Sequence, residues 1–174
     1  VGIPFGGGKG GVNFDPKQHS KREVMEVARA YVRAFAEHLG PDMDVPAPDV
    51  NTNPEIMDVM LEEYEKITGT SSPAFITGKS IEKGGSLGRD TATADGAIVV
   101  LESLLSDRHA DPSKFSAAVQ GGGNAGAQAA RLLADLGTKV VGLSDSKGSL
   151  LSLDGIDVAA ALSAKESGGS LGAN

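Results

Sequence analysis

A glycine-rich stretch, set between two regular segments, constrains the fold of this chain more than any other feature. The run from Phe115 to Val119 is short and apolar and predicts a buried strand, and the Ala- and Leu-rich segment from Ala127 to Leu136 predicts a helix. Between them, Gly121, Gly123 and Gly126 fit the pattern G-x-G-x-x-G. Such glycines allow a tight turn, a close approach of the backbone to a pyrophosphate, and close packing of helix on strand. The predicted dinucleotide contacts are Gly121, Gly123, Asn124, Ala125 and Gly126.

A second predicted strand follows this helix and ends at an acid. Lys139 to Ser144 is apolar enough for a strand, and Asp145 lies where dinucleotide-binding folds usually hold the ribose hydroxyls. The order strand, glycines, helix, strand, acid predicts a Rossmann-like α/β unit, although a glycine-rich turn without a ligand is the alternative. Asp145 favours a free ribose hydroxyl and Lys147 could meet a 2′-phosphate, so NAD and NADP both stay open.

Charge and composition exclude several classes of protein. The net charge of -7 argues against a nucleic-acid partner, because phosphate binding needs basic patches. The chain has no cysteine, which excludes thiol nucleophiles and disulfides, and His19 and His38 lack a second ligand at suitable spacing, so no metal site is expected. No apolar run approaches the length of a membrane span, and no membrane partner is expected. The chain begins at Val1 without Met, so we expect a fragment or a processed chain.

A lysine among glycines marks the start of the chain. Lys9 lies within the cluster Gly6 to Gly11, where small residues let a substrate come close. The cluster is not a phosphate-binding P-loop, because Gly10 stands where Ser or Thr would hold magnesium. A crowded, partly desolvated lysine has a depressed pKa and suits acid–base work on a carbonyl or amine. Composition alone leaves an exposed loop lysine as the alternative.

Two amphipathic helices are predicted next, with clear start signals. Ser20 and Glu23 form a capping box, and the apolar stripe that follows runs until Gly40. Asn53 with Pro54 predicts the start of the second helix. A hinge is expected after this helix, dividing the chain into residues 1–75 and 76–174.

Polar residues between and after these helices are further candidates. Asp44 and Asp49 lie in a proline-stiffened loop and suit either acid–base chemistry or local turn bonding. Arg89 and Thr93 lie near the start of a third predicted helix. Arginine suits a bidentate grip on a carboxylate, although a surface salt bridge is its commoner role. The residues from Ser167 to Asn174 are expected to form a loose tail.

Several motifs occur in the order and spacing of one known family. They are Ile3 to Gly11, Asp44 to Asp49, Ile76 to Lys79, Gly84 to Arg89 and Gly121 to Gly126. With these motifs the chain resembles the glutamate dehydrogenases of the Glu/Leu/Phe/Val dehydrogenase family, up to about Gly155. The resemblance implies the end of a substrate-binding, dimerisation-type α/β domain, followed by the first part of a Rossmann-like dinucleotide-binding domain. The missing parts of both domains would lie before Val1 and after Asn174, so the fragment is expected to be inactive alone.

The resemblance also assigns roles. Lys9 corresponds to the catalytic lysine and Asp49 to the acid–base aspartate, with Gly7, Gly8 and Arg89 beside the substrate, Thr93 beside the nicotinamide, and the glycine loop and Asp145 on the dinucleotide. The implied reaction is the reversible NAD- or NADP-dependent oxidative deamination of L-glutamate to 2-oxoglutarate and ammonia, in a cytoplasmic homohexamer. The alternatives are a branched-chain or aromatic amino-acid dehydrogenase of the same family and a non-catalytic dinucleotide-binding module.

Overall fold

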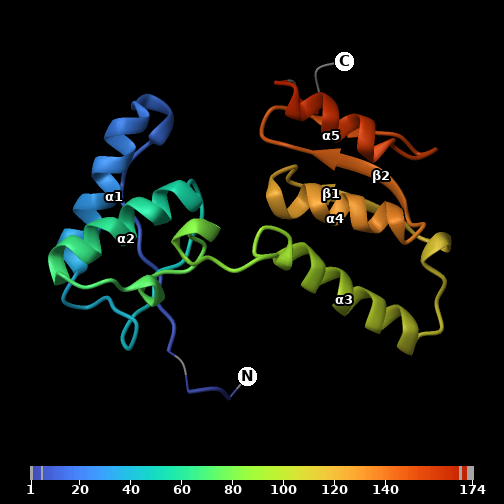
Figure 1. The fold of residues 1–174 in the computed structure, drawn as a ribbon. Helices are drawn as coiled ribbons and strands as arrows, with labels where there is room; N and C mark the ends of the chain where they lie inside the picture. The colour runs from blue at the N-terminus through green and yellow to red at the C-terminus, as the bar shows by residue number, and fades with distance from the viewer. Residues whose placement is uncertain (1, 5, 169, 172–174) are drawn as a thin grey trace. The chain divides into compact units, whose positions relative to one another are not determined.

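The computed structural model describes residues 2–4, 6–168 and 170–171, and the chain forms two compact units, Val1–Leu87 and Gly88–Asn174 (Figure 1). The first unit contains the helices α1 (Lys21–Phe35) and α2 (Pro54–Thr68). Three short 3-10 helices accompany them, at Pro16–Gln18, Pro73–Phe75 and Ile81–Lys83. Among the described residues of this unit there is no strand, only an isolated parallel bridge between Leu39 and Asp44.

Helix α1 starts where the sequence predicts and ends earlier. The Oγ of Ser20 accepts the N–H of Glu23 at 3.4 Å, and the Glu23 carboxylate accepts the N–H of Ser20 at 2.8 Å, which completes the capping box. The predicted stop at Gly40 is wrong, because the helix ends at Phe35. The N–H of Leu39 still bonds the Phe35 carbonyl at 3.1 Å, but the chain has already turned so that Leu39 can pair with Asp44.

The segment after α2 packs onto that helix. Phe75 is fully buried, and its ring stacks on Tyr64 at a centroid distance of 3.9 Å and an interplanar angle of 10°. The N–H of Ser80 donates to Asp58 of α2 at 2.9 Å. These contacts keep the segment in the first unit, so the structural division lies between Leu87 and Gly88, after the expected hinge at residues 75 and 76.

The second unit is built around a small sheet of β1 (Ser116–Gln120), β2 (Lys139–Ser144) and β3 (Ser149–Leu151). Strand β1 pairs with β2 in parallel, which confirms the predicted strand–helix–strand order. The helix between them, α4 (Asn124–Asp135), packs against both strands (Figure 1). Strand β3 was not predicted and runs antiparallel to β2.

Two more helices, α3 (Ala92–Asp107) and α5 (Val158–Glu166), pack on α4, and a short 3-10 helix at Pro112–Lys114 precedes β1. The core of this unit gathers Ile98, Ala130, Leu133, Val140, Leu143, Val158, Leu162 and Leu171. The expectation of a loose tail is wrong at Leu171, which is 2% exposed and packs in this core. Gly169 and residues 172–174 of the expected tail lie outside the described residues. No helix in the described part of the chain is long and apolar enough to cross a membrane.

Candidate functional site

In the first unit, the structure brings together the two residues that the sequence singles out as a catalytic pair. The ammonium Nζ of Lys9 donates to Oδ2 of Asp49 at 2.8 Å, although 40 positions separate them in the sequence. Both side chains are open to solvent, with 88% and 62% of their surfaces exposed. Asp44, the other candidate of the same loop, bonds instead through its backbone carbonyl to the N–H of Gly40 at 3.1 Å.

A tight turn holds Asp49 in place. Its N–H donates to Oγ1 of Thr52 at 2.7 Å, and its Oδ1 accepts the N–H of Val50 at 2.9 Å. The loop is tied to the rest of the unit by the N–H of Thr77, which donates to the Pro46 carbonyl at 2.9 Å. The Thr52 hydroxyl thus fixes the Asp49 backbone and the N–H of Val50 holds Oδ1, which leaves Oδ2 for Lys9.

The ion pair shifts both pKa values away from neutrality. The hydrogen bond from Lys9 is the main cause of the lowered pKa of Asp49, and the N–H of Val50 adds to it. The bond to Asp49 in turn raises the pKa of Lys9. The expectation of a depressed lysine pKa is wrong for this structure, because Lys9 is exposed and faces a carboxylate instead of lying in a desolvated pocket.

The glycines around Lys9 fall into two kinds. A Cβ on Gly10 would collide with the hydroxyl of Tyr31, so Gly10 lets the loop pack against α1. A Cβ on Gly7 or Gly8 would meet nothing within 4 Å, and both residues are exposed. Packing within the unit thus explains the small residue at Gly10. At Gly7 and Gly8 no packing requires a glycine, and their backbone near Lys9 is exposed to solvent.

In the second unit, the glycine loop has the geometry expected of an anion cradle. Gly121 has φ +98°, a left-handed conformation that favours glycine. A Cβ on Gly126 would overlap the Gly121 carbonyl oxygen and lie 3.4 Å from Cγ1 of Val119, so glycine is required for helix and strand to approach. A Cβ on Gly123 would meet nothing within 4 Å.

The N-terminus of α4 is open. Gly123 is its N-cap and no side chain caps it, while Asn124 and Ala125 of the first turn are exposed. Uncapped N–H groups at a helix start bind phosphate well. Asn124 Nδ2 donates to the Asp90 carbonyl at 2.5 Å, which fixes this turn to the segment before α3. The residues present therefore fit a dinucleotide pyrophosphate.

Asp145 ends β2 as predicted, but its carboxylate already has backbone partners. Oδ1 accepts the N–H groups of Lys147 at 2.8 Å and Gly148 at 3.0 Å, and Oδ2 accepts that of Leu171 at 3.3 Å. The bond from Lys147 is the main cause of its lowered pKa. Asp145 thus shapes the turn into β3, and a ribose would have to share the carboxylate with that turn.

The remaining predicted residues lie at the start of α3. Arg89 is exposed in the turn before the helix, and Thr93 is exposed in its first turn. Both belong to the second unit, and their places beside substrate and nicotinamide stay predictions. Among the described residues, no group of three or more His, Cys, Asp or Glu is arranged to hold a metal ion.

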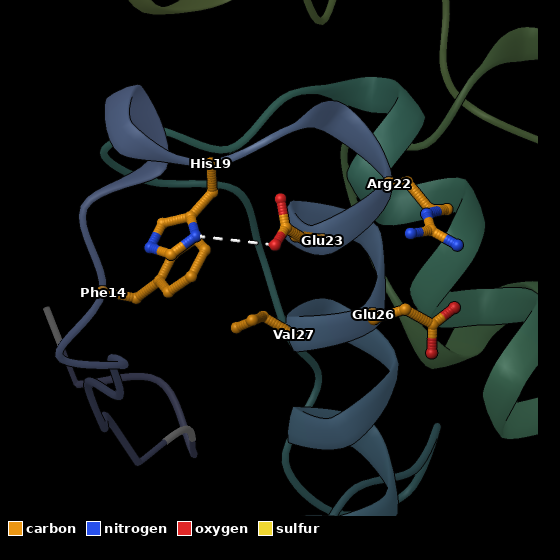
Figure 2. A pocket seen from close by; sticks show the side chains of 6 residues that line it. All are labelled: Phe14, His19, Arg22, Glu23, Glu26 and Val27. Carbon is orange, nitrogen blue, oxygen red and sulfur yellow. Dashed lines mark ion pairs between the residues drawn. The ribbon is translucent and has the colours of Figure 1, made fainter.

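A hollow beside α1 was not singled out by the sequence (Figure 2). The rings of Phe14 and His19 stack there at a centroid distance of 4.2 Å. Nδ1 of His19 faces Oε1 of Glu23 at 4.0 Å, and Val27 adds an apolar wall (Figure 2). None of the predicted catalytic residues lines this hollow, and both stacked rings belong to the segment before α1.

Comparison with known families settles the classification. A family model described as Glu/Leu/Phe/Val dehydrogenase, dimerisation domain, matches residues 1–66, and one described as Glutamate/Leucine/Phenylalanine/Valine dehydrogenase matches residues 84–173. The chain belongs to the Glu/Leu/Phe/Val dehydrogenase family. The resemblance drawn from the sequence motifs is thereby confirmed.

Individual members of this family are similar along most of the chain. The NAD-specific glutamate dehydrogenase of Staphylococcus aureus (strain COL) is 44% identical over 171 residues, which is 98% of this chain and 41% of that relative. The cryptic catabolic NAD-specific glutamate dehydrogenase GudB of Bacillus subtilis (strain 168) is also 44% identical, with 98% of this chain and 40% of the relative covered. The chain therefore spans about two fifths of the length of these family members.

Solved structures of glutamate dehydrogenases share the fold. The hetero-hexameric enzyme from Thermus thermophilus, in its Leu-bound form, gives a TM-score of 0.84 at 36% identity, covering 90% of this chain and 38% of that one. The enzyme from Peptoniphilus asaccharolyticus gives 0.75 at 36% identity, covering 96% and 44%. The predicted α/β class, with a Rossmann-like second part, is confirmed.

One residue of the second unit was missed by the sequence analysis. Lys165 of α5 reaches the glycine loop and donates to the Gly122 carbonyl. Its position on a helix distant in sequence carried no signal that a pattern of residues could reveal.

Proposed function

We propose that the complete protein is a glutamate dehydrogenase, which interconverts L-glutamate and 2-oxoglutarate plus ammonia with NAD or NADP. The observation that carries this proposal is the bond of 2.8 Å between Lys9 and Asp49, within a chain of this dehydrogenase family. The relatives named as NAD-specific glutamate dehydrogenases support the substrate and favour NAD.

The charges of the pair suit the reaction. Because its pKa is raised, Lys9 stays an ammonium at neutral pH and can stabilise negative charge that develops on oxygen. Asp49 is a carboxylate that can take a proton from the substrate amine or from water, although the bond from Lys9 lowers its pKa and so makes it a weaker base. A bound substrate would have to share these groups, which are paired with each other in the structure.

The proposed oxidation of L-glutamate passes through an imine. The glycine loop and the first turn of α4 would hold the dinucleotide, whose nicotinamide would supply the acceptor for the hydride from the α-carbon of glutamate. Loss of the amine proton leaves an imine, water adds to its carbon, and departure of ammonia gives 2-oxoglutarate. Asp49 moves protons to and from the nitrogen, and Lys9 stabilises the oxygen of the attacking water and of the product carbonyl.

The other predicted residues extend this proposal. Gly7 and Gly8 would give the substrate access to open backbone, and Arg89 would bind a substrate carboxylate. Thr93 would lie beside the nicotinamide. The pyrophosphate would bind at the glycine loop and the first turn of α4, with the ribose near Asp145. We also propose that the complete protein forms a homohexamer in the cytoplasm; the hexamer of the Thermus thermophilus enzyme supports six subunits, although that enzyme is a hetero-hexamer.

Turnover of the complete protein with different amino acids tests the proposed substrate. We expect NAD reduction with L-glutamate to exceed that with L-leucine, L-valine or L-phenylalanine by orders of magnitude in kcat/KM. Preference for one of the other three amino acids would replace glutamate as the substrate, and cofactor binding without turnover of any of them would leave a dinucleotide-binding module.

A further inference from the structure

The glycine loop is held from one side by a lysine of a different helix. Nζ of Lys165, on α5, donates a hydrogen bond to the carbonyl oxygen of Gly122, and the lysine side chain is half-buried. A carbonyl that accepts from a cation makes a charge-assisted bond, which is stronger than a bond between neutral groups. The bond joins the centre of the loop to a helix 43 residues further along the chain.

The same side of the loop is closely packed. Gly122 is buried, and a Cβ on it would lie 2.7 Å from Cδ1 of Leu171 and 3.2 Å from Nζ of Lys165. Gly123, the next residue, is exposed and faces open space. One peptide unit of the loop is thus covered by α5 and Leu171, while the residue after it is free to meet a ligand.

The geometry of the peptide bond between Gly122 and Gly123 links the side of the loop that faces α5 to the side that is open. The described residues contain no cis peptide, so the C=O of Gly122 and the N–H of Gly123 point in opposite directions. When Lys165 holds the carbonyl toward α5, the N–H of Gly123 must point away from α5. If this peptide rotated, its carbonyl would replace an N–H next to the helix start and would repel a phosphate.

We propose that Lys165 is a positioning residue for the dinucleotide, which orients the Gly122–Gly123 peptide so that its N–H is available to the pyrophosphate. This inference rests on the proposed function, because it needs a dinucleotide at the loop. Lys165 acts through the loop backbone, although its side chain also lines the hollow that Gly123 and Asn124 border.

The test compares NADH dissociation constants in the complete protein, measured by the change in nicotinamide fluorescence. Lys165→Met removes the donor and keeps most of the apolar stem, and we expect the dissociation constant to rise about tenfold to a hundredfold, the range for losing a hydrogen bond to a charged group. Lys165→Arg keeps a cationic donor and should recover most of the affinity. The kcat at saturating NADH and the KM for 2-oxoglutarate should stay within about twofold of wild type, since only cofactor binding depends on the loop.

A matched control separates local positioning from loss of charge. Lys114 is exposed just before β1, at the opposite end of that strand from the loop, and Lys114→Met removes the same charge from the same unit. Its NADH affinity should match wild type. If Lys165→Met fails to fold, Lys165→Leu takes its place, since leucine keeps an apolar stem and has no hydrogen-bond donor.

The outcomes are distinct. Wild-type affinity in the Lys165→Met or Lys165→Leu protein, or equal weakening in Lys114→Met, overturns the inference while leaving the proposed function intact. A wild-type protein that binds neither NADH nor NADPH overturns the proposed function itself.

Discussion

Substitutions of two glycines in the same loop should have different effects on the free energy of unfolding and on NADH affinity. In Gly126→Ala, the new Cβ would overlap the Gly121 carbonyl oxygen and lie 3.0 Å from the Gly121 carbonyl carbon. Real Cβ atoms do not make such contacts with backbone, so the loop or α4 must shift. Overpacking of this kind costs about 1–3 kcal/mol of the free energy of unfolding. We therefore expect Gly126→Ala to lower both stability and NADH affinity.

Gly123→Val should instead lower NADH affinity with little change in stability. Its Cβ would meet nothing within 4 Å, and φ at this position is -75°, which any residue adopts. The free energy of unfolding should change by about 1 kcal/mol or less, as for other exchanges at a helix N-cap. The side chain would fill the space expected for the pyrophosphate, so NADH affinity should fall at least about tenfold, or about 1.4 kcal/mol.

Urea unfolding and NADH titration of the complete protein measure the two quantities separately. A Gly123→Val protein with unchanged NADH affinity would place the cofactor elsewhere. A Gly126→Ala protein as stable as wild type would show that the loop tolerates the added methyl group and that close packing does not require glycine there.

Two further predictions concern the first unit. In Lys9→Met, Asp49 loses the main cause of its lowered pKa, so the pKa of Asp49 should rise toward the ordinary value, as measured by the NMR shift of its carboxylate carbon across pH. In wild type, the ion pair stabilises the fold at pH values above the ordinary carboxyl pKa. This contribution is lost as the pH falls through the lowered pKa of Asp49. Phe75→Ala should cost about 3–5 kcal/mol in urea unfolding, because the ring is fully buried against Tyr64, and a loss under about 1 kcal/mol would show that the segment after α2 does not belong to the core of this unit.

Local signals in the sequence predicted local structure well. The capping box of Ser20 and Glu23 and the N-cap of Asn53 mark where α1 and α2 begin, because each is complete within a few residues. The end of α1 was not predictable in this way. It depends on the pairing of Leu39 with Asp44, which forms only when the chain folds back.

Contacts between distant segments explain the other differences. Strand β3 is three residues long, and Leu151 is 78% exposed, so its residues show no buried alternation that predicts a strand. Leu171 lies in a glycine- and serine-rich segment and is buried only because the core of the second unit receives it. Lys165 contacts the glycine loop only because of where α5 packs, and no sequence motif indicates this packing.

In the candidate site, too, some features could be predicted from the sequence and others depend on the folded structure. Resemblance to a family pointed to Lys9 and Asp49, and the structure places their charged atoms 2.8 Å apart. The direction of the lysine pKa could not be inferred from the surrounding glycines, because it depends on exposure and on the facing carboxylate. The family resemblance thus predicted which groups meet, and the structure decides the direction in which their pKa values shift.

The most direct test of the account is the kcat of Asp49→Asn in the complete protein, measured with saturating L-glutamate and NAD. Asparagine keeps the size of the side chain and can still accept the N–H of Val50, but it cannot take a proton. We expect kcat to fall by about 10²–10⁴-fold, the contribution of a general acid–base group, while NADH affinity and the free energy of unfolding stay near wild type. A kcat within a few-fold of wild type would contradict the role of Asp49 in proton transfer and with it the proposed mechanism.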